Sequence, residues 1–409
     1  MRRVVITGAG IISPAGNTIA EFWDNIQNGR CSISEITRFD TSGLKVKIAA
    51  EVKNFDPNDF DINVKEARRM DLFCKYALAS AKQAVFDSGI EGKVSPERFG
   101  VYIGSGIGGI NTLLEECVKG HEKGVARTSP LFIPKMIANM ASGHVSLRFN
   151  ARGACLPVVT ACATSTNAVG EAFRAIKHGY ADAIIAGGTE AAIVPVAVAG
   201  FTNCMALSLK NDPLNSSTPF DKDRDGFVMS EGACTLILEE YEHALKRKAK
   251  IYAEISGYGN TSDAYHVTAP DPSAESPSLA IKMALKEAGL TGAEAIYYNA
   301  HGTSTPLNDK TETLALKKAF GQYAPQIKIS STKSITGHML GAAGAAEALV
   351  SILALKHGVI PPTIGYKTFD PECDLFYTPN TAIKFDATAA LSASFGFGGH
   401  NACIALKKI

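Results

Sequence analysis

Short apolar runs alternate with longer stretches of helical periodicity along the first half of the chain. The stretch 65–87 has apolar side chains at helical spacing and predicts one amphipathic helix, while 163–178 predicts a helix rich in small residues. A short helix is predicted at 241–248. Apolar, β-prone runs predict buried strands at 4–7, 99–104, 156–159, 183–186, 235–238 and 251–257. Strands alternating with helices are typical of an α/β fold.

The second half of the chain repeats this alternation. Its pattern predicts helices and strands in the order helix 277–288, strand 295–299, helix 309–320, strand 327–330 and helix 342–357, with a strand at 402–406 near the end. The end of the helix at 163–178 and the end of the helix at 342–357 also have nearly the same residues. We therefore expect two related α/β halves, residues 1–250 and 251–409, packed into one body.

Composition and charge exclude several functional classes. A formal net charge of +1 gives no whole-molecule argument for binding nucleic acid. The 9 cysteines are scattered and never spaced as CxxC, which argues against a disulfide framework or a zinc site and for a reducing compartment.

A strand at the very N-terminus leaves no room for a signal peptide, and the apolar region 183–201 is interrupted by Glu190 and Pro195. We expect a cytoplasmic protein with no membrane span and no metal.

Two motifs that suggest ligands are incomplete. Gly8-x-Gly10 follows a strand as a dinucleotide loop would, but the third glycine is missing and Pro14 breaks the helix that should follow. The sequence of residues 221–226 starts like a calcium loop, but it contains Lys222 and Arg224 and lacks the glutamate at the twelfth position. We predict an ion-paired loop there instead.

Cys162 lies between the apolar run 156–159 and the small-residue helix that begins near Ala163. At a helix N-terminus, unpaired backbone N–H groups and the macrodipole favour a thiolate, and the same groups can hold an oxyanion. The alternative is a structural cysteine, because free cysteines are among the most buried residues. The residues downstream favour the catalytic interpretation.

Two histidines lie in glycine-framed loops that each follow a predicted strand. His301 is in the run Asn-Ala-His-Gly-Thr-Ser-Thr, and His338 follows Lys333 by five residues. Open α/β folds bind ligands where strands end and helices begin, so Cys162 and both histidines are predicted to meet in one pocket. A thiol and two imidazole donors suit acyl transfer, with Lys333 and Glu347 orienting the histidines. A Cys-His-Asp hydrolase fits less well, since no carboxylate is marked as the third member.

The motifs together identify a family. Thr160-Ala161-Cys162, residues 299–305, Lys333 with Gly337-His338, and residues 394–399 resemble the β-ketoacyl-[acyl-carrier-protein] synthases over the whole chain. Residues 221–228 and 262–266 resemble the synthase II branch. The resemblance implies a thiolase-like fold, in which two pseudo-symmetric α/β halves form α-β-α-β-α layers, and usually a homodimer.

The resemblance also implies an activity. An acyl group held on Cys162 would undergo a decarboxylating Claisen condensation with malonyl-acyl-carrier-protein, giving 3-oxoacyl-carrier protein in fatty-acid elongation. No cofactor would be bound permanently, because the substrates travel on the phosphopantetheine arm of acyl carrier protein. His301 and His338 would drive decarboxylation, with Lys333 and Glu347 as supporting charges.

The remaining site residues are likewise implied by the resemblance. Phe397 would act as a mobile gate, and Ile107 would lie at the mouth of the acyl pocket. Residues that would bind the acyl chain or the phosphopantetheine arm are Ile107, Phe201, Thr268, Thr303, Thr305, Phe395 and Phe397. Basic residues that would bind the acidic carrier protein are Lys65, Arg68, Arg69 and Lys210.

Two alternatives share much of this pattern. A degradative thiolase would use a second cysteine near the C-terminus as a base, but Cys403 falls inside a predicted strand. A non-catalytic partner subunit, like the chain-length factors of aromatic polyketide systems, would lack the nucleophile that this chain keeps.

Overall fold

The computed structural model describes the whole chain, Met1 to Ile409, around one sheet of ten strands. The strands lie in the order β10-β9-β13-β14-β8-β1-β7-β6-β4-β5. Their bounds are β1 Val4–Ile12, β4 Phe99–Gly104, β5 Cys155–Leu156, β6 Ala183–Glu190, β7 Gly232–Glu240, β8 Ala253–Ser262, β9 Ile296–Asn299, β10 Lys328–Ser330, β13 Ala389–Gly396 and β14 His400–Lys407. Two small hairpin-like pairs complete the strands: β2 Ser34–Glu35 with β3 Ile48–Ala49, and β11 Val359–Ile360 with β12 Ile383–Lys384.

The two ends of the sheet have the same pairing pattern. On one side, β5, β4 and β6 are parallel, and β7 and β1 continue antiparallel. On the other side, β10, β9 and β13 are parallel, and β14 and β8 continue antiparallel. Antiparallel pairing of β1 with β8 joins the two sets. Each set is therefore a mixed five-strand unit whose parallel strands lie at the outer edge.

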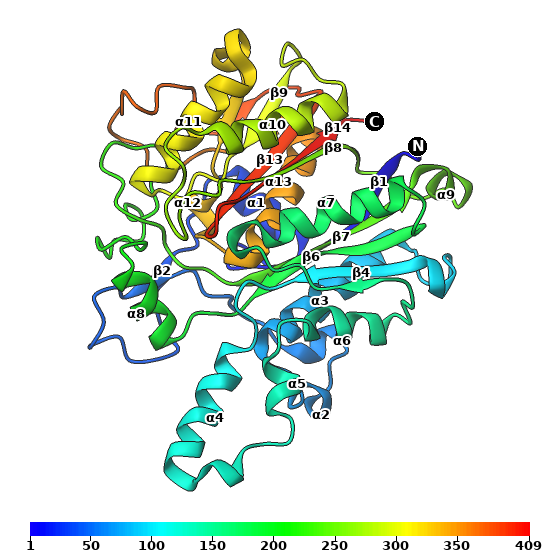
Figure 1. Cartoon of the computed structure of the whole chain (residues 1–409), viewed down its shortest axis with the longest axis vertical. Helices are drawn as coiled ribbons and strands as arrows, with labels where there is room; N and C mark the ends of the chain where they lie inside the picture. The colour runs from blue at the N-terminus through cyan, green and yellow to red at the C-terminus, as the bar shows by residue number, and fades with distance from the viewer.

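Helices form three layers around these strands. α3 (Leu72–Ser88) packs on β1 and β7, while α10 (Glu275–Ala288) packs on β8 and β14 and contacts α11 (Pro306–Phe320). α7 (Thr164–Lys177) and α13 (Ala343–His357) contact each other and strands of both sets. In Figure 1, α7 and α13 cross the centre of the molecule, with α10 and α11 on one side and α3 on the other. These are the α-β-α-β-α layers of the thiolase-like fold that the sequence predicts.

The remaining eight α-helices complete the fold. Their bounds are α1 Ile19–Gln27, α2 Val64–Ala67, α4 Ile110–Lys123, α5 Phe132–Met136, α6 Met140–Arg148, α8 Pro195–Asn203, α9 Tyr241–Lys246 and α12 Lys333–Thr336. In Figure 1, α4 extends away from the layered body at the lower end of the molecule.

The predicted helix at 65–87 is wrong in one respect, because it is two helices. α2 ends at Ala67 and α3 begins at Leu72, with Asp71 in an extended conformation between them. The Asp71 carboxylate accepts hydrogen bonds from the backbone N–H and hydroxyl of Thr112, at 2.8 and 2.6 Å. That long-range contact holds the chain out of the helix at this point.

Glycines lie inside β1, although the prediction ended this strand at residue 7. The chain remains extended to Ile12 because α3 crosses β1 at very short range. A Cβ on Gly8 would lie 2.3 Å from the carbonyl oxygen of Ala84, and one on Gly10 would lie 2.0 Å from that of Ser80. These glycines thus permit helix–strand packing and do not form a nucleotide loop.

Two apolar segments lie in the core. Residues 183–201 form β6 and most of α8, and β6 is buried along its whole length. The segment Leu340–His357 is the one helical stretch long and apolar enough to cross a membrane, and 89% of it is buried inside the structure. It contains α13, the central helix between the two strand sets, which accounts for its apolar composition.

Candidate active site

The parallel strands of each set end at the edge where the candidate residues lie. β9 is parallel to both of its neighbours, β10 and β13, so the C-terminal ends of these strands and the segments after them come together: His301, the stretch from Lys333 to His338, and Phe395 to Phe397. In the other set, β4, β5 and β6 bring Ile107, Cys162 and Glu190 to their common edge. This is the position at which α/β sheets place their ligands.

A cavity of about 410 Å³ lies between the two sets of strands. Cys162, His301 and His338 all line it. Its other lining residues include the predicted Thr268, Thr303, Thr305, Phe395 and Phe397. The sequence placed the thiol and the histidines in different halves of the chain, and the structure brings them to one cavity.

Cys162 lies in a 3₁₀ turn, Ala161–Ala163, just before the first residue of α7. Side chains of α7 fix this turn: the Thr160 N–H donates to the Thr164 hydroxyl at 2.9 Å, and the Thr160 hydroxyl donates to Asn167 at 2.7 Å. The strand predicted before it is also shorter than expected. β5 is two residues long and exposed, because it forms the edge of the sheet.

The expected low pKa of the thiol is not found. Burial raises the pKa of Cys162 to about 12, and the positive charge of Lys333 opposes this only in part. The negative charges of Glu190 and Glu347 add to the increase. In the protein without substrate, Cys162 is therefore a thiol, and desolvation outweighs its position near the start of a helix.

One tautomer of His338 follows from its contacts. The Leu340 N–H donates to Nδ1 of His338 at 3.3 Å, so the ring proton is on Nε2. His338 is buried and its Nε2 has no hydrogen-bond partner, although the residue lines the cavity. A buried N–H without a partner is costly, and here it is available to a carbonyl oxygen of a ligand.

The backbone of His338 is held by residues 227–230, which follow the charged loop at 221–226. The His338 N–H donates to the Val228 carbonyl at 2.8 Å, and the Ser230 N–H donates to the His338 carbonyl at 2.9 Å. The ring of Phe227 contacts the His338 imidazole edge-on, with centroids 5.1 Å apart. Residues 227–230 thus hold both the backbone and the ring of His338 in place.

His301 lies beside His338, with ring centroids 5.4 Å apart. Its loop is fixed by Glu312 of α11, a residue that sequence analysis missed. The Glu312 carboxylate accepts the backbone N–H groups of His301 and Gly302 at 2.8 and 2.7 Å and the hydroxyl of Tyr298 at 3.1 Å. The signal in the sequence that could have indicated Glu312 was its acidic side chain, eleven positions after His301, within the helix predicted at 309–320.

Lys333 and Glu347 form a buried ion pair next to the histidines. Burial raises the pKa of the Glu347 carboxyl to about 7, and the adjacent Lys333 opposes that increase. Burial, together with the charge of Lys333, holds the pKa values of His301 and His338 well below the usual range. Both imidazoles are therefore neutral near pH 7.

The charged loop at 221–226 is ion-paired, as predicted. Arg224 is buried and forms ion pairs with Asp370 at 2.6 Å and Asp309 at 3.6 Å. It also donates to the backbone carbonyls of Thr305 and Pro306, at 3.3 and 3.1 Å. Arg224 thereby fixes the segment that carries Thr303 and Thr305, whose hydroxyls lie 2.8 Å apart at the cavity.

Phe397 is half-buried and packs against an apolar cluster that also contacts Cys162 and Phe201. Gly396, next to it, approaches the Cys162 turn so closely that a Cβ there would lie 2.6 Å from the Thr160 carbonyl oxygen. Beyond Phe397, the Gly398 N–H donates to the Val267 carbonyl, and the Asp263 N–H donates to the Gly399 carbonyl. The loop around Phe397 is therefore docked on the loop that carries Thr268.

Neither Ile107 nor Phe201 lines the 410 Å³ cavity, although Phe201 packs against the same apolar cluster as Cys162 and Phe397. Phe201 contacts Phe227 edge-on, with centroids 5.5 Å apart. The Ile107 N–H donates to the carboxylate of Glu190 at 3.1 Å.

The predicted carrier-protein residues are in two places. Lys65, Arg68 and Arg69 are exposed on and just after α2, and none of them forms an ion pair. Lys210 is exposed but donates to the Asp223 carbonyl at 2.6 Å and lies 3.9 Å from the carboxylate of Asp225. Lys65, Arg68 and Arg69 thus form no ion pair, whereas Lys210 contacts the charged loop at 221–226.

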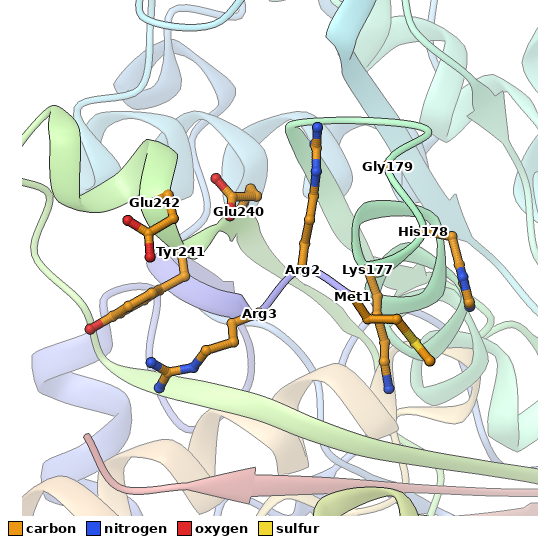
Figure 2. Close-up of a pocket in the computed structure, with 9 residues that line it drawn as sticks. All are labelled: Met1, Arg2, Arg3, Lys177, His178, Gly179, Glu240, Tyr241 and Glu242. Atoms are coloured by element: carbon orange, nitrogen blue, oxygen red, sulfur yellow. The ribbon is translucent and has the colours of Figure 1, made fainter.

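A larger hollow of about 640 Å³ lies around the N-terminus (Figure 2), and Cys162 does not line it. Its basic side chains Arg2, Arg3 and Lys177 are each paired with a carboxylate, at 2.7, 2.7 and 2.6 Å. Because these pairs leave little charge for a ligand, the Cys162 cavity is the stronger candidate for an active site.

Comparisons with known proteins show the family of the chain. Residues 1–244 match the family model for the N-terminal domain of β-ketoacyl synthases, and residues 252–367 match the model for the C-terminal domain. A 3-oxoacyl-[acyl-carrier-protein] synthase 2 from Synechocystis is 50% identical over 100% of this chain and 98% of its own length. The synthase 2 of Staphylococcus aureus is 49% identical, again over 100% of this chain and 98% of its own.

Solved structures give the same result. A β-ketoacyl synthase from Burkholderia phymatum superposes with a TM-score of 0.93 at 35% identity, over 100% of both chains. A type II polyketide ketosynthase, solved in complex with its acyl carrier protein, superposes with a TM-score of 0.90 at 33% identity, over 100% of this chain and 99% of its own.

Proposed function

The chain belongs to the β-ketoacyl synthase family, and we propose that it condenses an acyl thioester with malonyl-acyl-carrier-protein in fatty-acid elongation. The product is 3-oxoacyl-carrier protein, and the enzyme is an acyltransferase of the synthase 2 type. The single observation that carries the proposal is that Cys162, His301 and His338 line one cavity.

In the first half-reaction, Cys162 takes the acyl group. Its sulfur attacks the carbonyl of the acyl thioester, the bond from that carbonyl to the phosphopantetheine sulfur breaks, and the thiol proton ends on the released sulfur. Backbone N–H groups of Cys162 and Phe397 would stabilise the oxyanion, because the Phe397 N–H already lowers the pKa of the thiol and Gly396 permits this close approach.

In the second half-reaction, the histidines act on the malonyl group. The Nε2–H of His338, and the imidazole of His301 beside it, would donate to the thioester carbonyl oxygen. The carboxylate leaves as CO₂, and its bonding electrons form an enolate that these donors stabilise. The enolate carbon then attacks the acyl carbonyl on Cys162, and the sulfur of Cys162 leaves as a thiolate that takes a proton from solvent. The charge of Lys333 would help to keep the histidines neutral, and Glu347 would hold Lys333 in place.

Both alternative functions lose support from the structure. A thiolase would need Cys403 at the site, but Cys403 is buried within β14 and does not line the cavity. A non-catalytic subunit would lack the nucleophile, whereas here the thiol shares its cavity with two neutral histidines.

The substrates would reach the cavity on the phosphopantetheine arm, with Thr268, Thr303 and Thr305 along its path. Related ketosynthases act with acyl carrier protein. We propose the exposed Lys65, Arg68 and Arg69 as its docking patch. We also propose a homodimer in the cytoplasm, since β5 is an exposed edge strand and all nine cysteines are free.

Mass spectrometry tests the role of Cys162 directly. Incubation with an acyl-carrier thioester should add one acyl mass to the peptide that contains Cys162. Cys162→Gln should abolish condensation but keep malonyl decarboxylation, because it leaves His301 and His338 in place. The matched control is Cys403→Ser, a buried cysteine outside the cavity, which should still be acylated on Cys162. Acylation on another cysteine would refute the proposal.

A further inference from the structure

Glu190, the last residue of β6, is a buried carboxylate to which neither half-reaction assigns a role. One oxygen, Oε1, accepts the Ser105 hydroxyl at 2.8 Å and the Ile107 N–H at 3.1 Å. The other, Oε2, accepts the Gly106 N–H at 2.9 Å and the Gly341 N–H at 3.0 Å. Four donors from two segments, far apart in the sequence, thus converge on one side chain.

The two glycines leave room for this carboxylate. A Cβ on Gly106 or on Gly341 would lie 2.8 Å from Oε2 of Glu190, and a Cβ on Gly341 would also lie 2.6 Å from the Gly106 nitrogen. The loop after β4 and the turn before α13 are therefore in direct contact through Glu190. Such close contact couples the position of one segment to that of the other.

Neighbouring amides of that turn hold Glu190 and His338. The Gly341 N–H donates to Glu190, and the Leu340 N–H donates to Nδ1 of His338. Leu340 has a φ of 48°, in the left-handed region that a leucine seldom adopts. A conformation of this kind persists only where surrounding contacts enforce it, and the bond to Glu190 is one such contact.

We infer that Glu190 is a positioning residue that fixes the Ile107 loop and the Leu340–Gly341 turn in one arrangement, so that His338 keeps its donor nitrogen directed into the cavity. The inference rests on the proposed function, since it assigns Glu190 to the decarboxylating half-reaction. It also connects the loop that carries Ile107 to the histidine that would act on malonyl.

Glu190→Gln tests this role with little change in shape. The amide group replaces one acceptor oxygen with a donor that faces backbone N–H groups, which should loosen the turn. We expect the kcat of malonyl decarboxylation to fall at least about tenfold, with KM for malonyl-carrier protein changed less than about twofold. Alkylation of Cys162 by iodoacetamide should be at least as fast as in the wild type, because the charge of Glu190 raises the thiol pKa.

A purely structural role would give a different result. Glu239→Gln is the matched control, because Glu239 is a buried carboxylate on β7 that binds Arg247 and Thr7 and does not line the cavity. Glu239→Gln should lower the thermal stability, but it should change the rate of malonyl decarboxylation and the rate of Cys162 alkylation to the same extent. If Glu190→Gln does not fold, Ser105→Ala takes its place, because it removes one donor to Glu190. Ser105→Ala should also lower decarboxylation more than alkylation, by a smaller factor.

The outcomes separate this inference from the proposed function. A wild-type enzyme that does not decarboxylate malonyl-carrier protein would refute the proposed function itself. An active wild type with equal losses of decarboxylation and alkylation in Glu190→Gln, or with no loss in either, would overturn the role of Glu190.

Discussion

Burial keeps both histidines of the site uncharged near neutral pH, and the charge of Lys333 adds to this effect. A neutral imidazole with its proton on Nε2 donates to a carbonyl oxygen without bringing a competing positive charge. The same burial keeps Cys162 protonated in the absence of substrate. At the scale of single residues, desolvation therefore sets the protonation states with which the reaction begins.

Glu312 gives a stability prediction that depends on pH. Burial raises the pKa of its carboxyl from 4.5 to about 7. The folded state then keeps a proton that the unfolded state releases, so the stabilisation is full below pH 4.5 and is lost as the pH rises through 7. The free energy of unfolding of the wild type, minus that of Glu312→Gln, should fall by about 3 kcal/mol across this window. Urea denaturation at several pH values measures it, and a constant difference would contradict the prediction.

Phe397 gives a kinetic prediction. Its ring packs against the apolar cluster next to Cys162, so it would have to move when an acyl chain enters there. Phe397→Ala should leave the fold and the alkylation of Cys162 unchanged, lower condensation by about tenfold and make the order of substrate binding less strict. Initial-rate patterns with both substrates measure this. Unchanged steady-state kinetics in a stable variant would rule out a gate.

At the scale of elements, the break between α2 and α3 determines how the basic residues are presented. Because the chain leaves the helix after Ala67, Arg68 and Arg69 lie on a connecting segment and not along the side of a long helix. They are exposed and form no ion pairs, as an acidic partner would require. This supports α2 and its C-terminal end as the docking element for acyl carrier protein.

Charge reversal tests that element. Arg68→Glu together with Arg69→Glu should raise KM for carrier-bound substrate by about tenfold and reduce its dependence on salt, with turnover of a small pantetheine thioester unchanged. Lys246→Glu with Lys248→Glu is the matched control, since it reverses the same charge at α9, on another side of the molecule (Figure 1). Equal losses on both substrates would count against the patch.

At the scale of the whole molecule, the active site requires both sets of strands. Cys162 follows β5 of one set, and His301 and His338 follow β9 and β10 of the other. The same pairing pattern in each set supports our proposal that residues 1–250 and 251–409 are two related halves. Their junction, the antiparallel pair β1 and β8, holds the two parts of the cavity together.

The exposed edge of the sheet predicts a dimer. Leu156 in β5 and Val159 after it are 49% and 52% exposed, and an unpaired edge strand of this kind can pair with a second copy. Leu156→Asp with Val159→Asp should convert the dimer to a monomer in sedimentation experiments. Leu245→Asp, at an apolar position of α9 that is 45% exposed, should leave the dimer intact. A wild-type monomer would refute the prediction.

The sequence by itself determined the class of fold, most of the long elements and the identity of the candidate catalytic residues. Strands such as 99–104 and helices such as 342–357 follow from local hydrophobic periodicity, which nearby residues set. Cys162, His301 and His338 were recognisable because each lies in a motif at the end of a predicted strand. The thiolase-like layers and the synthase family followed from the same motifs.

Only the tertiary structure decided the features that depend on distant segments. The pKa of Cys162 follows from burial between the two strand sets, and the glycines of β1 remain in a strand because α3 packs on them. Glu190 binds backbone N–H groups far from it in the chain, and Glu312 binds those of the His301 loop only because α11 folds back against that loop, so the local pattern identified neither residue. Desolvation and close backbone contact arise only when the chain is folded, and they are the physical reason why the sequence alone did not reveal them.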